Sequence, residues 1–228
     1  YGAGFVVGRY MFKTSRREAI LLGLACALTN HILFVLPIAI TLFGEQAAAP
    51  IVAIITMDSI VLFSLTSMTM DIIVHKDGSV FHLLGKIMRN PPVVAMSSGL
   101  LVALAGFDVP ANVDVFLEFA GGAAAPCALF SLGVILSQKQ DSDRALLPVV
   151  LTAVKLLIHP ALAWLVLVSF FDLPATISTP AMMVAAAPCG AMAFVLALNY
   201  QVRVDAIARA IFYSSIGSLL TITLAAAL

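Results

Sequence analysis

Long runs of apolar residues constrain this chain more than any other feature. After an apolar stub at roughly 1–12, they lie near 18–43, 47–73, 91–107, 113–137, 145–170, 178–199 and 207–228. About 20 apolar residues of helix cross the roughly 30 Å hydrocarbon core of a bilayer, so the runs predict seven complete crossings. They lack the period-two alternation of a β-barrel wall. The sequence therefore predicts an all-α membrane protein, a polytopic bundle of helices.

The composition excludes most water-soluble classes. Of the 228 residues, 62% are hydrophobic and 11% are charged, whereas a soluble domain has about 45–50% apolar and about 25% charged residues. Twelve basic residues balance twelve acidic ones, and no basic block indicates binding to nucleic acid. The three cysteines have neither a disulfide framework nor zinc-site spacing. We also find no arrangement typical of an intramembrane protease and no phosphate-binding glycine loop, so we expect neither an enzyme nor a cofactor or metal.

The basic residues indicate an orientation. Alternate loops between the runs place 11 of the 12 Lys and Arg residues on one face. The other face receives four acidic residues, Glu45, Asp108, Asp114 and Asp172. Because Lys and Arg concentrate in cytoplasmic loops, we expect the basic face inside and the C-terminus outside. Segment 75–90 has an apolar helical face and predicts an amphipathic connector along the inner surface.

Two of the runs contain residues that interrupt a helix. Asn30 and His31 lie mid-run and precede Pro37, while Pro188 and Cys189 lie among small residues in 178–199. Proline removes a backbone hydrogen bond, and in lipid the freed carbonyl needs another partner. A broken helix offers free carbonyls to cations and free amides to anions, so two broken helices indicate a transporter site. We predict substrate contacts at these five residues. The alternatives are plain proline kinks and, for His31, a bond to another helix.

Two charged residues lie deep within apolar runs, Asp58 in 47–73 and Lys155 in 145–170. A charge at mid-bilayer costs roughly 2.5–3.5 kcal/mol on insertion scales, which makes both residues candidates for function. Either they form a buried structural ion pair, or Lys155 attracts an anionic substrate while Asp58 handles a proton or cation. Lys155 could also extend toward the inner face.

The spacing of the breaks suggests an inverted repeat within one transmembrane domain, 1–228. Each broken run is followed by one closing run, before the connector 75–90 in one half and before the end of the chain in the other. Residues 91–228 then form a five-span second repeat, and 1–74 form the end of the first. Completing the symmetry requires two further spans before Tyr1, giving ten.

Several motifs resemble the auxin efflux carrier family of membrane transporters, which includes bacterial malonate-type carriers. Asn30, Pro37 and Gly44 match its Asn, Pro and Gly pattern. Residues 125–133 look like its Pro-x-Ala-Leu-Phe-x-Leu-Gly motif, with Pro126 and Gly133 as structural positions, and Pro188 resembles the proline of its second broken helix. The resemblance implies a ten-span fold with two crossing broken helices. It also implies a transport domain that moves like an elevator against a scaffold domain, in a bacterial inner membrane.

We therefore expect a secondary transporter that moves a small organic anion, a carboxylate, by alternating access. The substrate would bind at the two breaks and Lys155, and Asp58 would be the coupling site for a proton or sodium ion. The expected partners are this anion, the lipid bilayer and, in a homodimer, a second copy. The alternative is a transport-inactive sensor or assembly subunit that keeps the fold.

Overall fold

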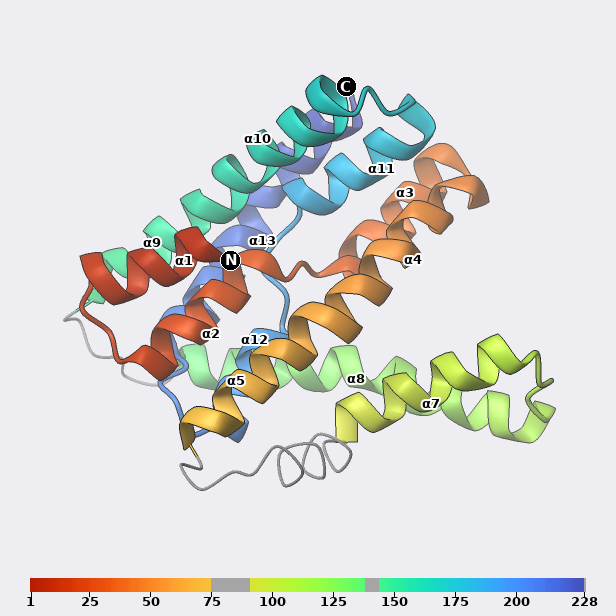
Figure 1. Ribbon diagram of the computed structural model, residues 1–228, viewed down its shortest axis with the longest axis horizontal. Coiled ribbons are helices and arrows are strands. Elements are labelled where there is room, and N and C mark those ends of the chain that lie inside the picture. The colour runs from red at the N-terminus through yellow and green to blue at the C-terminus, as the bar shows by residue number, and fades with distance from the viewer. Residues whose placement is uncertain (75–90, 138–143, 228) are drawn as a thin grey trace.

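The computed structural model describes residues 1–74, 91–137 and 144–227, and these residues form helices without a β-strand (Figure 1). The α-helices are α1 (Gly2–Val6), α2 (Arg16–Ala27), α3 (Leu36–Phe43), α4 (Ala48–Met57), α5 (Ser64–Val74), α7 (Pro91–Ala105), α8 (Ala111–Ser137), α9 (Leu146–Ala153), α10 (His159–Trp164), α11 (Ala175–Ala186), α12 (Met192–Asn199) and α13 (Asp205–Ala226). The expected connector at 75–90 lies outside the described residues.

The seven expected runs coincide with these helices to within a few residues, which confirms the all-α class. Three helical stretches are long and apolar enough to cross a membrane, at 45–74, 146–170 and 205–226. In the stretches 45–74 and 146–170, π-helical turns connect successive α-helices. By contrast, α2 is separated from α3, and α11 from α12, by residues outside any helix.

Short π-helical segments interrupt the α-helices. They are η1 (Val7–Met11), η2 (His31–Val35), η4 (Asp58–Phe63), η6 (Val154–Ile158) and η7 (Leu165–Phe170), and a 3₁₀ turn, η3 (Glu45–Ala47), precedes α4. Two of the π-helical segments end two residues before a proline. Leu36 N–H bonds to His31 O before Pro37, and His159 N–H bonds to Val154 O before Pro160. The wider turn accommodates the missing proline N–H without breaking the helix.

The first break therefore does not lie at Pro37. The expectation of an interruption spanning Asn30–Pro37 is corrected to the extended residues 28–30, where α2 has ended and η2 has not begun. Pro37 is exposed in the first turn of α3. The second break falls at 187–190, as expected from Pro188 and its small neighbours.

Two clusters of buried apolar side chains flank the breaks. One joins α2, α5, α9, α12 and α13 and includes Leu21, Leu151 and Phe194. The other joins η2, α3, α4, α11 and α13 and includes Val35 and Met183. The two breaks lie where these clusters meet, because residues 28 and 189 belong to the first cluster and residues 186 and 187 to the second.

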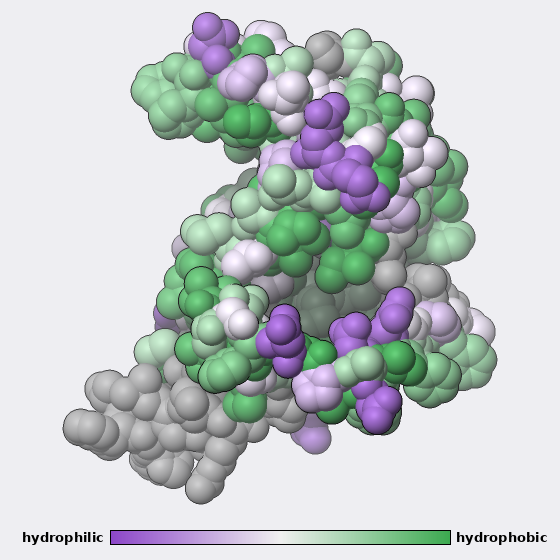
Figure 2. Space-filling model, turned by 90° about the vertical axis from the view of Figure 1, so that its right-hand side faces the viewer, coloured by the Kyte–Doolittle hydropathy of each residue, from purple (hydrophilic) through white to green (hydrophobic). Residues whose placement is uncertain are grey.

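Helices α7 and α8 form a hairpin that extends from the other helices (Figure 1). Large apolar side chains cover it, and Phe107, Phe119 and Phe130 are more than 70% exposed. Seen from the side to which this hairpin extends, the molecule is hydrophobic over most of its face, with hydrophilic side chains in small patches (Figure 2). Such a face is suited to lipid or to other apolar surfaces rather than to water.

Candidate functional site

The two breaks meet and pair with each other. Asn30 N–H donates to Pro188 O at 3.1 Å, and Gly190 N–H donates to Leu28 O at 3.0 Å. Thr29 and Cys189 thereby form a single antiparallel bridge. In Figure 1 the segment after α2 passes the segment between α11 and α12 near the centre of the molecule. Each break thus satisfies backbone groups that the other leaves free, as a low-dielectric environment requires. We call residues 28–30 and 187–190 the crossing.

Gly190 permits the close approach. A Cβ atom at this position would lie 2.9 Å from Thr29 O and 3.2 Å from Thr29 C. Both are backbone atoms, which cannot rotate away as the end of a long side chain can. Gly190 is therefore a point where the two backbones approach closely.

Lys155 reaches the crossing from η6. Its side chain is fully buried, and its Nζ donates to Thr29 Oγ1 and lies 2.9 Å from His159 Nδ1. Full burial excludes the interpretation in which Lys155 extends to the inner face. An ammonium group has three donors, and within the described residues two acceptors lie in reach. A charged donor is therefore buried at the crossing with one proton still available.

His31 and Asp58 form a second polar pair beside the crossing. His31 Nε2 lies 2.9 Å from Asp58 Oδ2, which is ion-pair distance, but it makes no hydrogen bond of good geometry. Their side chains are 8% and 23% exposed. The alternative in which Asp58 and Lys155 form a direct ion pair is not what the structure shows, because each residue has a different partner. His31 instead lies at ion-pair distance from a residue of another helix.

Three of the ionisable residues at or beside the crossing lie on π-helical segments. His31 is the first residue of η2, Asp58 is the first of η4, and Lys155 is the second of η6. A π-helical turn shifts the direction of the residues around it and is frequent at functional sites. Three separate helices therefore direct an ionisable group toward the same region.

The remaining predicted site residues divide into two groups. Asn30, Pro188 and Cys189 lie in the crossing, and Cys189 N–H donates to Ser214 Oγ of α13 at 3.0 Å. The structure does not bring the others there. These are Pro37 in α3 and the motif residues Pro126 and Gly133 of α8, all three exposed.

Thr29, His159 and Ser214 were missed by the sequence reasoning. His159 had a usable signal, since it follows Lys155 by four residues and so lies on the same helical face. Thr29 adjoins Asn30 but is an ordinary residue in a membrane helix. Ser214 had no signal, because its role depends on the packing of α13 against the second break.

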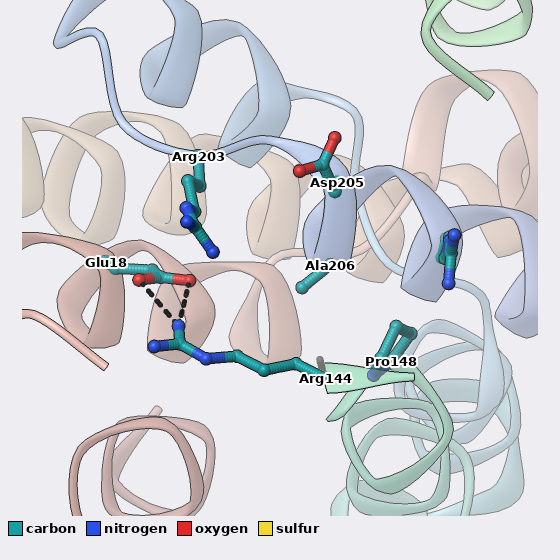
Figure 3. Close-up of a pocket in the computed structure, with 7 residues that line it drawn as sticks. Glu18, Arg144, Pro148, Arg203, Asp205 and Ala206 are labelled. Carbon is teal, nitrogen blue, oxygen red and sulfur yellow. Dashed lines mark hydrogen bonds and ion pairs between the residues drawn. The ribbon is translucent and has the colours of Figure 1, made fainter. Parts of the chain in front are cut away.

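A separate charged cavity lies where α2, α9 and α13 begin (Figure 3). Arg144 Nη1 is 3.2 Å from both carboxylate oxygens of Glu18, and the Arg203 side chain lines the same cavity. Asp205, Arg209 and Pro148 complete the lining. Charged side chains from the starts of three helices thus gather in one cavity that does not include the crossing.

An all-helical membrane chain with two broken helices that cross at buried polar groups has the architecture of a membrane transporter. Residues 2–226 match the membrane transport protein family, and the chain belongs to this family, that of the auxin efflux carriers. It is 26% identical over 225 residues to a protein of Rhizobium meliloti (strain 1021) named "Putative malonate transporter". That alignment covers 96% of this chain and 70% of the relative. The predicted family is confirmed, and the protein is a membrane transporter and not an enzyme.

Proposed function

We propose that the protein is a secondary transporter that carries a small carboxylate of the malonate class by alternating access. The observation that carries the proposal is the buried Lys155 ammonium at the crossing, with one proton unused. An uncompensated charge inside a membrane protein is costly and is retained where it serves a function. The name of the Rhizobium relative agrees with an anion of this kind.

The carboxylate would accept the third proton of Lys155 and further hydrogen bonds from the crossing. The Asn30 side chain is suited to this role, because it is partly exposed and makes no hydrogen bond with the described residues. The helical segments that restart at His31 and Met192 add the positive ends of their dipoles. Pro188 and Cys189 would shape the site through their backbone, and His31 through its contact with Asp58.

Asp58 is the proposed coupling site for a proton or sodium ion. Its carboxylate lies beside the crossing, is partly exposed, and faces His31 rather than a permanent cation. A cation bound there would offset the charge of the incoming anion. Asp58→Asn would then separate anion binding, which remains, from ion-driven accumulation, which is lost.

We also propose an elevator-like movement. The helices around the crossing form a packed body with two apolar clusters, whereas the α7–α8 hairpin is largely exposed. The packed body would carry the substrate, and the hairpin would belong to the scaffold and contact a second copy in a homodimer. The basic end around Arg144 and Arg209 would face the cytoplasm of a bacterial cell, with the C-terminus outside.

Uptake of labelled malonate into proteoliposomes tests the proposal. Asn30→Ala, Pro188→Ala and Lys155→Met should each lower uptake at least tenfold, because each removes part of the binding geometry. Asn112→Ala, on the exposed first turn of α8, is the matched control and should retain it. If all three variants transport like the parent protein, the site assignment is wrong. If the parent protein binds carboxylates without moving them, the sensor alternative is favoured.

A further inference from the structure

The contact between Lys155 and His159 limits the charge of the two residues to at most one positive charge while the hydrogen bond is made. Their nitrogens are 2.9 Å apart, and a hydrogen bond between them needs one donor and one acceptor. An ammonium group has no acceptor, so a charged Lys155 requires an unprotonated Nδ1 on His159. With the proton on either nitrogen, the pair carries one positive charge.

Among the described residues, the acid near this pair is Asp58, which is already engaged by another side chain. The titratable side chains around Lys155 are Cys26, Cys189 and Asp58, and those around His159 are Lys155 and His31. Asp58 is the acid among them, and it lies against His31. A second proton would therefore place two like charges in a buried region without an added anion to offset them.

A carboxylate at Lys155 changes this balance. Its negative charge offsets the ammonium and lowers the cost of placing a proton on His159. Once protonated on both nitrogens, His159 no longer accepts from Lys155, which frees a second ammonium proton for the carboxylate. Anion binding and proton binding therefore favour each other, and by thermodynamic linkage the effect is reciprocal.

We propose that His159 takes up one proton from solution when the carboxylate binds at Lys155, so that the anion and a proton are loaded together. The inference rests on the proposed function and names a proton acceptor that is distinct from Asp58. One proton enters for each anion, and a dicarboxylate is then carried with one compensating charge.

Calorimetric titration of the purified full chain with malonate measures this uptake. At one pH, the apparent binding enthalpy is recorded in several buffers of different ionisation enthalpy, and the slope gives the number of protons taken up. We expect about one for the parent protein and near zero for His159→Gln, which keeps a hydrogen-bond acceptor for Lys155. Malonate affinity should also fall up to tenfold per unit rise in pH for the parent protein but stay nearly constant for the variant.

Two further variants separate the possible proton acceptors. His82→Gln replaces a histidine that the proposed site does not include, and as the matched control it should leave the uptake in place. His31→Gln replaces the other imidazole near the crossing, and a loss of uptake there but not in His159→Gln would assign the proton to His31 and overturn the inference. Binding without proton uptake would overturn the inference, and so would uptake that persists in His159→Gln, since the proton would then reside on malonate or Asp58. Failure of the folded parent protein to bind malonate would instead contradict the proposed function itself. Folding of each variant is checked by its thermal unfolding and by gel filtration.

Discussion

Because Gly190 has no Cβ atom, the two breaks can approach closely enough to form the crossing. Replacing it with alanine would place Cβ 2.9 Å from a backbone oxygen, so the two breaks would have to separate. We expect Gly190→Ala to destabilise the protein by about 1–3 kcal/mol, as overpacking does, and to reduce malonate uptake. Thermal unfolding in detergent measures the first effect and proteoliposomes the second.

A glycine in open surroundings is the control for this prediction. A Cβ atom at Gly121 of α8 would meet nothing within 4 Å. Alanine is also favoured over glycine inside a helix by about 0.5–1 kcal/mol, so Gly121→Ala should leave the protein as stable as before or slightly more stable. Equal effects of the two substitutions would contradict a steric role for Gly190.

At the scale of elements, α13 holds the second break in place through one hydroxyl group. Ser214 is fully buried, and its Oγ accepts from Cys189 N–H at 3.0 Å. Ser214→Ala would leave that N–H without its partner, which costs about 1–3 kcal/mol. We expect a lower unfolding temperature and weaker malonate binding.

The neighbouring serine provides a matched comparison. Ser215 Oγ donates to Ile211 O on its own helix and does not contact the crossing. Ser215→Ala should change the free energy of unfolding by no more than about 0.5 kcal/mol. If both serine variants unfold alike, Ser214 does not support the break.

Tyr200 connects the end of α12 with α5. Its hydroxyl donates to Ser67 O at 3.0 Å, and burial raises the pKa of Tyr200 from 10 to about 12. The folded protein therefore keeps this proton at a pH where the unfolded chain has lost it. Stability from this group is complete below pH 10 and is lost as the pH rises toward about 12.

Unfolding measured across this pH range tests the role of Tyr200. Tyr200→Phe should destabilise the protein by about 1–3 kcal/mol at neutral pH, since it loses the contacts of the hydroxyl with the carbonyl and the hydroxyl of Ser67. Its stability should also fall less steeply above pH 10 than that of the parent protein. Identical slopes for the two proteins would show that another group titrates.

At the scale of the whole molecule, the Glu18–Arg144 pair joins two segments that are far apart in the sequence. Glu18 is nearly buried at the start of α2, where its backbone N–H is capped by Ser15 Oγ, and Arg144 is about one-third exposed just before α9. Arg144→Ala removes the ion pair that the nearly buried Glu18 carboxylate makes with it, and we expect a loss of about 1–3 kcal/mol. High salt should weaken the pair.

A double-mutant cycle isolates the pair itself. Because Arg144 is partly exposed, we expect a coupling energy of about 1 kcal/mol between Glu18→Ala and Arg144→Ala in unfolding experiments. Arg209→Ala removes the same charge from the same cavity and should cost less, because Arg209 has no ion-pair partner among the described residues. A coupling near zero would mean that the two ends are held together by apolar packing alone.

The sequence by itself determined the all-α membrane class, the positions of the helices and the two regions that interrupt them. These are local properties, because the length of an apolar run and the missing N–H of a proline act within a few residues. The family followed from the same motifs. Local rules failed at Pro37, where a preceding π-helical turn accommodates the proline and the break moves to 28–30.

Only the tertiary structure decided which side chains face one another. Lys155 and Thr29 are 126 residues apart in the sequence, and Cys189 and Ser214 are 25 apart. A charge buried in a bilayer must find a partner, but composition does not say which one. The sequence left a direct Asp58–Lys155 ion pair open, whereas the structure places Asp58 against His31 and Lys155 against Thr29 and His159. The reason is geometric: the rotation and wider turns of three packed helices set the direction of each ionisable group, and these depend on contacts across the whole chain.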